Sequence, residues 1–111
     1  MLDTTELTAA AERFADRLRA APQSRLQRGA AAEGLALARE LADRAQRAEF
    51  PGREPARLPD AGLFVVADQL VVAATDLAET LRTAPADTPG AEGALHEAVR
   101  LVREAEARAG L

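Results

Sequence analysis

The chain has no cysteine, and it also lacks lysine, isoleucine, asparagine, tyrosine and tryptophan. Without cysteine it cannot form disulfides, thiolate zinc sites or iron–sulfur clusters, and it cannot use a thiol as a nucleophile. Lysine, isoleucine, asparagine and tyrosine have AT-rich codons, whereas the abundant alanine and arginine have GC-rich codons. We therefore interpret the composition as that of a bacterial protein from a GC-rich genome, so the absence of lysine needs no functional explanation.

Long apolar runs are missing as well. The longest uncharged stretches are the seven residues on either side of Asp68, whereas a membrane-spanning helix needs about 20 apolar residues. The first residues carry neither the basic nor the apolar segment of a signal peptide, so we expect a cytoplasmic protein that does not enter a membrane. The net charge of −4 disfavours a nucleic-acid binder.

A chain of 111 residues has the usual size of one domain, and its alanine, leucine, glutamate and arginine favour helix. Four segments have helical spacing of apolar residues. We predict an all-α protein, an antiparallel up-down-up-down four-helix bundle, with the single domain spanning residues 1–111. The predicted helices cover about residues 4–20, 25–49, 61–83 and 89–109.

The first two segments have recognisable signals. The first opens at Asp3 with Glu6 three residues later, the spacing of a capping box, and it ends before Pro22. The second contains Gly34, which costs a helix about 1 kcal/mol relative to alanine. We expect a neighbouring helix to approach closely at this glycine.

The third segment carries Leu63, Leu70 and Leu77 at seven-residue spacing, and the three prolines of residues 50–59 form a stiff connection before it. A small β-hairpin over residues 63–72 is the alternative, because β-branched residues flank Asp68. The Asp-Gln pair lacks the positive-φ preference of a two-residue hairpin turn, so helix is favoured.

No residue constellation has a catalytic, metal or cofactor signature. His96 is the only histidine, and a di-iron bundle needs Glu-x-x-His on two helices. Ser24 is the only serine and lacks the Gly-x-Ser-x-Gly elbow of hydrolases, so we interpret it as a helix cap. The glycine-rich phosphate loops are also missing. We predict that the protein is not an enzyme and has no cofactor.

Arginines gather around the turn between the first two helices. Arg13, Arg17, Arg25 and Arg28 could together bind an anionic or phosphorylated small molecule, because the guanidinium fork matches phosphate. Salt bridges to the acid-rich third and fourth helices are the alternative interpretation, and we favour it.

The third helix has apolar residues on more than one side. Val65 and Val72 project away from the leucine stripe, and Phe64 and Val71 lie beside them. Such a pattern indicates either a central helix or contact with a second chain. We expect a small helical interaction module of regulatory, adaptor or structural role, a homodimer or bound to another protein. A ligand-responsive regulator that reads an anion at the arginines is the alternative.

Overall fold

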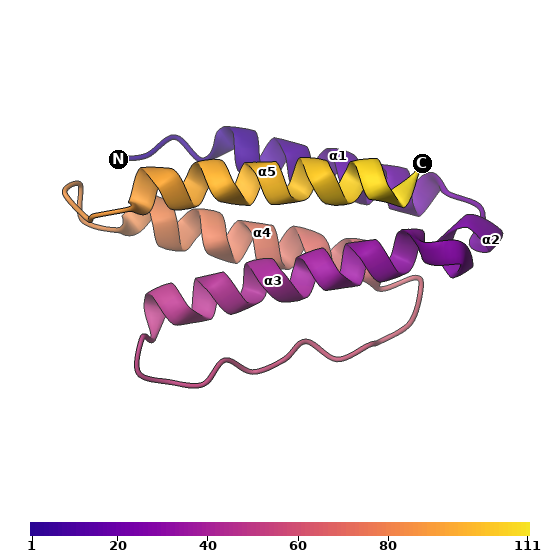
Figure 1. The fold of residues 1–111 in the computed structure, drawn as a ribbon, viewed down its shortest axis with the longest axis horizontal. Coiled ribbons are helices and arrows are strands. Elements are labelled where there is room, and N and C mark those ends of the chain that lie inside the picture. The colour runs from indigo at the N-terminus through magenta and orange to yellow at the C-terminus, as the bar shows by residue number, and fades with distance from the viewer.

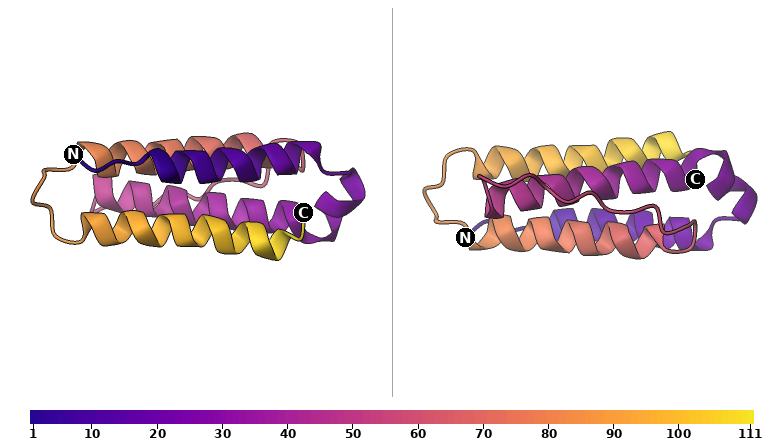
Figure 2. Two further views of the ribbon diagram at one scale, coloured as in Figure 1. Left: turned by 90° about the horizontal axis from the view of Figure 1, so that it is seen from above. Right: turned by 90° about the horizontal axis from the view of Figure 1, so that it is seen from below.

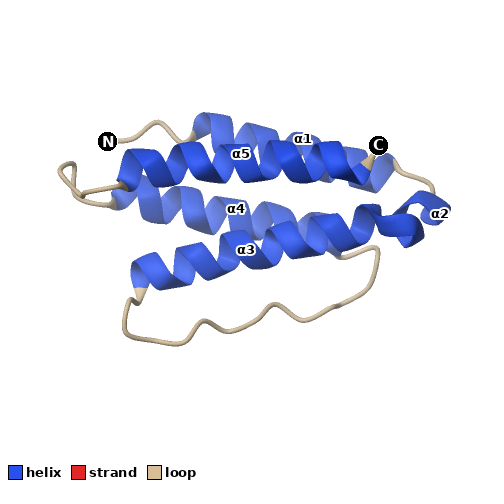
Figure 3. Cartoon of the chain, in the orientation of Figure 1, coloured by secondary structure: helices blue, strands red, loops and turns tan.

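The computed structural model describes residues 1–111 and contains only helices and loops (Figures 1 and 3). The long helices are α1 (Thr5–Ala20), α3 (Ala31–Glu49), α4 (Val66–Thr83) and α5 (Ala91–Ala109). A short helix, α2 (Gln23–Arg25), and a kinked turn, η1 (Leu26–Ala30), connect α1 to α3. The predicted all-α four-helix bundle is confirmed. None of its helices combines the length and apolarity that a bilayer crossing demands.

The four long helices stand at the corners of a square (Figure 2). Each of α1 and α3 packs against both α4 and α5, while the diagonal pairs, α1 with α3 and α4 with α5, touch little. The two short connections therefore join helices across the diagonals of the bundle. The long connection, residues 50–65, joins two neighbours and is called the crossover segment below.

The predicted up-down-up-down order of helix directions is wrong. The crossover segment returns along α3, so α4 begins at the same end of the bundle as α3 (Figure 1). Gly34 near the start of α3 lies against Val66 at the start of α4, and Ala48 near the end of α3 borders the same depression as Thr83 at the end of α4. Helices α3 and α4 are thus parallel, and the order is up-down-down-up.

The reason lies in the length of the crossover segment. An extended chain advances about 3.3 Å per residue, so this segment can span the roughly 28 Å of a 19-residue helix. A short link between α3 and α4 would force antiparallel neighbours, whereas a connection of this length can carry the chain back to the other end of the bundle. Its prolines keep the segment from forming a helix of its own.

Three predicted helix boundaries also need correction. The second predicted helix, 25–49, is interrupted at Gly29, whose φ of 145° lies outside the helical region. Helix α4 begins at Val66 instead of residue 61, because Gly62 has a φ of 99° and donates its N–H to Asp60 Oδ1 at 3.0 Å. A positive φ of this kind ends a helix and favours glycine. Helix α5 begins two residues later than predicted, at Ala91.

The core is built largely from small residues. Of its 27 buried apolar residues, 13 are alanine, and small side chains allow helix axes to approach closely. Phe14, Leu7, Leu41, Leu70 and Val102 are the largest fully buried side chains. The burial of Leu70 confirms that the leucine stripe of α4 faces inward.

Gly34 marks a close contact between helices. A Cβ atom added there would lie 2.8 Å from Val66 Cγ1 and 3.0 Å from Leu18 Cδ1. Three helices, α1, α3 and α4, therefore meet at the hydrogen of one glycine. The close approach that was expected at this position is present.

This contact predicts an inverted effect of a helix-favouring substitution. Gly34→Ala should gain about 1 kcal/mol of helix propensity but lose about 1–3 kcal/mol through overpacking against the stiff Val66. Its free energy of unfolding, measured with urea, should fall by up to about 2 kcal/mol. Gly93→Ala is the matched control, because a Cβ there meets no atom within 4 Å, and it should be neutral or stabilising. A Gly34→Ala protein as stable as the control would show that the helices are further apart.

Candidate functional site

Two of the candidate anion-binding arginines converge on one buried carboxylate. Arg13 Nη2 lies 3.3 Å from Glu106 Oε1, and Arg17 Nη1 lies 3.1 Å from Glu106 Oε2. Glu106 belongs to α5 and is only 8% exposed, whereas both arginines reach solvent. The Arg13 contact is a hydrogen bond, while the Arg17 contact is an ion pair without hydrogen-bond geometry. The favoured interpretation, salt bridging to an acidic helix, describes these two arginines.

The other two arginines lie nearby. Arg25 Nη1 donates to the carbonyl oxygen of Gly110 at 2.8 Å, and Arg17 and Arg25 line a shallow depression of about 350 Å³ beside Pro22. Arg28 is exposed. The structure thus brings Arg17 and Arg25 to one depression and joins Arg13 to Arg17 through Glu106. An anion-binding role for the group stays a prediction.

The helix directions give the arginines a structural role. Parallel neighbours place like ends of their helix dipoles side by side, so the dipoles of α1 and α5 do not cancel each other. Every long helix has an acid in its first turn and a base in its last turn. The acids are Glu6, Glu33, Asp68 and Glu92, and the bases are Arg17, Arg19, Arg47, Arg82 and Arg108. These charged side chains stabilise the ends of each helix dipole without the help of an antiparallel neighbour.

The buried carboxylate predicts an asymmetric mutational response. Arg13→Met with Arg17→Met keeps the hydrocarbon cover but leaves Glu106 without a cation, which should cost about 3 kcal/mol. Glu106→Met leaves only arginines that can turn to water, so its cost should stay below about 1 kcal/mol. The triple variant should recover most of the loss. Urea unfolding checks the order, and a Glu106→Met protein as unstable as the double variant would contradict it.

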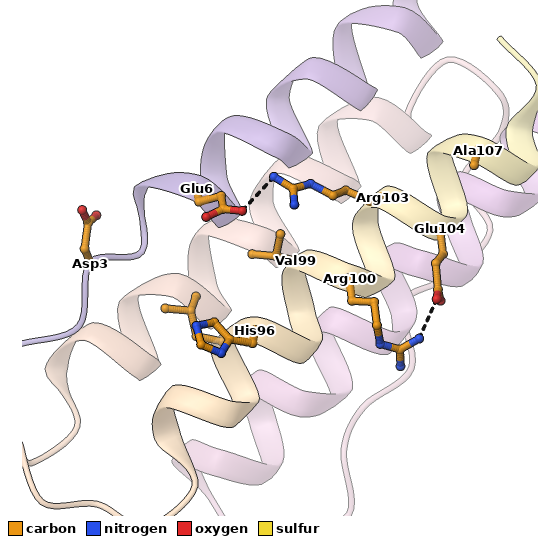
Figure 4. Close-up of a pocket in the computed structure, with 9 residues that line it drawn as sticks. Asp3, Glu6, His96, Val99, Arg100, Arg103, Glu104 and Ala107 are labelled. Carbon is orange, nitrogen blue, oxygen red and sulfur yellow. Dashed lines mark hydrogen bonds and ion pairs between the residues drawn. The ribbon is translucent and has the colours of Figure 1, made fainter.

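The only histidine lines a groove between the start of α1 and the outer face of α5 (Figure 4). The groove has a volume of about 550 Å³, and Leu95 and Val99 contribute apolar surface. Glu6 and Arg103 point toward one another across it, 2.7 Å apart. His96 is exposed at its edge.

The charges of this groove are engaged with one another. Arg100 pairs with Glu97 and, at 2.6 Å, with Glu104, and its hydrogen bonds lower the pKa of Glu97. Hydrogen bonds from Thr5 lower the pKa of Asp3. The groove therefore offers a mainly charged and polar surface with two apolar side chains.

Neither a metal centre nor a relative directs the assignment of function. No group of three histidine, cysteine or acidic side chains is placed to hold a metal ion. Ser24 lies inside the short helix α2 and does not cap it, because Pro22 occupies the capping position. Comparisons with protein-family models, curated proteins and solved structures find no match to the chain.

Helix α4 and the turn that leads into it expose large apolar side chains. Phe64 is 78% exposed, Val72 58% and Val65 39%. The whole chain exposes only five large apolar side chains, so three of them fall within nine residues of each other. Val71, the fourth residue predicted for self-association, is half-buried and packs against the core. We call Phe64, Val65 and Val72 the α4 patch.

One ion pair borders the α4 patch. Asp68 lies between Val65 and Val72 in the sequence, and its Oδ1 accepts a hydrogen bond from Arg19 Nη2 of α1 at 2.7 Å. This bond is the main cause that raises the pKa of Arg19. The α4 patch is therefore apolar and is bordered by one acid and one base.

Sequence reasoning missed two features of the surface. Glu106 follows the buried Val102 by four residues, so both lie on the same face of the helix. An acid on an otherwise apolar helix face was therefore the sequence signal for a buried carboxylate. The contacts of Gln46 and Gln69 with the crossover segment, described below, gave no signal. These contacts depend on which residues of the crossover segment lie opposite α3 and α4. The spacing of apolar residues in the sequence does not predict that placement.

Proposed function

We propose that the protein is a small helical interaction module that associates with a second copy of itself through the α4 patch. The observation that carries the proposal is the joint exposure of Val72 on α4 and of Phe64 and Val65 in the turn that leads into α4. A single exposed valine is ordinary, because apolar atoms form more than half of a protein surface. Three large apolar side chains gathered at the start of one helix favour burial against another molecule.

The charges beside the patch favour a second copy as the partner. A twofold interface brings the same surface of both chains together, so that surface must complement itself. With two α4 helices antiparallel, Val65 of one copy faces Val72 of the other, and Asp68 falls near the twofold axis. Each Asp68 already holds Arg19. Two such pairs meeting at the axis place acids beside bases, an arrangement that supports association.

The association should be visible as molecular mass. Light scattering on a sizing column at high micromolar concentration should give twice the monomer mass of 11.7 kDa. Val72→Glu should bring two acidic side chains into the interface and weaken dimerisation about a hundredfold or more. Because Val72 is exposed, the melting temperature of the dissociated chain should stay near that of the wild type at low concentration.

Ala36→Glu is the matched control, because it adds the same charge at an exposed position of α3. The control should remain dimeric. A wild-type chain of 11.7 kDa at high concentration would show that self-association is wrong. Dissociation of both variants would mean that net charge, and not the α4 patch, controls the association.

A further inference from the structure

The crossover segment lies over the groove between α3 and α4 (Figure 2). Side chains of these two helices hold it through its backbone. Arg39 Nε donates to the carbonyl oxygen of Leu58 at 2.9 Å, and Gln69 Nε2 donates to that of Pro59 at 2.9 Å. Backbone contacts of this kind recognise an extended chain whatever its side chains are.

Gln46 makes the most complete contact. Its Nε2 donates to the carbonyl oxygen of Ala56 at 3.0 Å, and its Oε1 accepts from the N–H of Ala56 at 2.9 Å. One amide side chain thus satisfies both backbone groups of one residue. A neighbouring strand would offer an extended peptide the same donor and acceptor.

Leu58 is the apolar side chain of the segment that lies nearest these backbone hydrogen bonds. Leu58 is half-buried against the core and, together with Ala42, Ala45 and Thr80, lines a depression of about 490 Å³. Backbone hydrogen bonds combined with one apolar pocket are how peptide-binding modules obtain affinity and specificity.

The fit of the segment is incomplete at one atom. Gln69 donates to Pro59 as Gln46 donates to Ala56, but its Oε1 is buried and has no hydrogen-bond partner. Proline has no N–H, so Pro59 cannot return the bond as Ala56 does. A buried acceptor without a donor is costly, and a residue with an N–H at this place would remove that cost.

We propose that the groove between α3 and α4 binds an extended peptide of a partner protein, which displaces the crossover segment. The peptide carries a leucine followed by a residue that has a backbone N–H. A second copy of this chain is disfavoured as the donor of the peptide, because it would bring the same Pro59. The proposal does not need association through the α4 patch, although Phe64 and Val65 of that patch lie at the end of the crossover segment.

The tethered segment competes with any such peptide. A short tether gives the segment an effective concentration on the order of millimolar, so the wild-type chain should bind the peptide weakly. Leu58→Ser removes the anchor of the segment and leaves the groove residues intact. The full-length Leu58→Ser chain should therefore bind the peptide at least about tenfold more tightly than the wild type.

The test uses fluorescent peptides with the sequence of residues 53–61, followed by anisotropy. One peptide keeps proline at the position of Pro59, a second has alanine and a third has N-methylalanine, which lacks the N–H. The alanine peptide should bind the Leu58→Ser chain about tenfold more tightly than the other two. Gln69→Leu should abolish this difference, and Gln46→Ala should weaken all three peptides.

Leu58→Ala is the second host variant, and circular dichroism confirms that each variant keeps its helix. If Leu58→Ser unfolds, the comparison is made in Leu58→Ala and by titrating the wild type with millimolar peptide. Equal binding of the three peptides, or no binding to any of these chains, would overturn the proposal. A mass of Leu58→Ser above that of the wild type at the same concentration, without peptide binding, would also overturn it, because it would indicate exchange of the segment between copies.

Discussion

The contact of α1, α3 and α4 at Gly34 constrains the rest of the bundle. Without a side chain at this position, Val66 of α4 and Leu18 of α1 approach the α3 backbone more closely than an alanine would allow. The contact fixes the start of α4 beside the start of α3, and so the two helices run parallel. The chain must then travel the length of the bundle between them, which the crossover segment does. Both surfaces with a proposed function, the α4 patch and the α3/α4 groove, follow from that placement.

Parallel neighbours change the electrostatics of the bundle. In an up-down-up-down bundle, adjacent dipoles oppose and partly cancel one another, but here α1 and α5 end side by side. The arginines that gather between residues 13 and 28 lie at this end, where Arg25 binds the Gly110 carbonyl at the end of α5. Arg13 and Arg17 also compensate the buried Glu106. The gathering of arginines between residues 13 and 28 thus has a structural explanation. Binding of an anion by these arginines would be a second role.

Local features of the fold could be predicted from the sequence, whereas its connectivity could not. Heptad spacing identified Leu70 as buried, and the same periodicity placed Val65 and Val72 outside the leucine stripe. Gly34 was expected at a close helix contact because its propensity cost needs compensation. The parallel pairing was missed because proline content indicates where a helix stops, not where the following chain travels. The boundary at Gly62 was missed because a glycine near a helix start is compatible with several backbone conformations. The incomplete contact at Gln69 needs coordinates, since it depends on Pro59 lying opposite.

Paramagnetic labelling tests the parallel packing of α3 and α4 most directly. The chain has no cysteine, so Ala48→Cys, an exposed position near the end of α3, gives a unique site for a nitroxide. The amide signals of residues 80–83 should broaden strongly, because Ala48 borders the same depression as Thr80 and Thr83. The amide signals of residues 66–69, at the other end of α4, should keep their intensity. Broadening of residues 66–69 with residues 80–83 unaffected would show antiparallel helices and contradict the account.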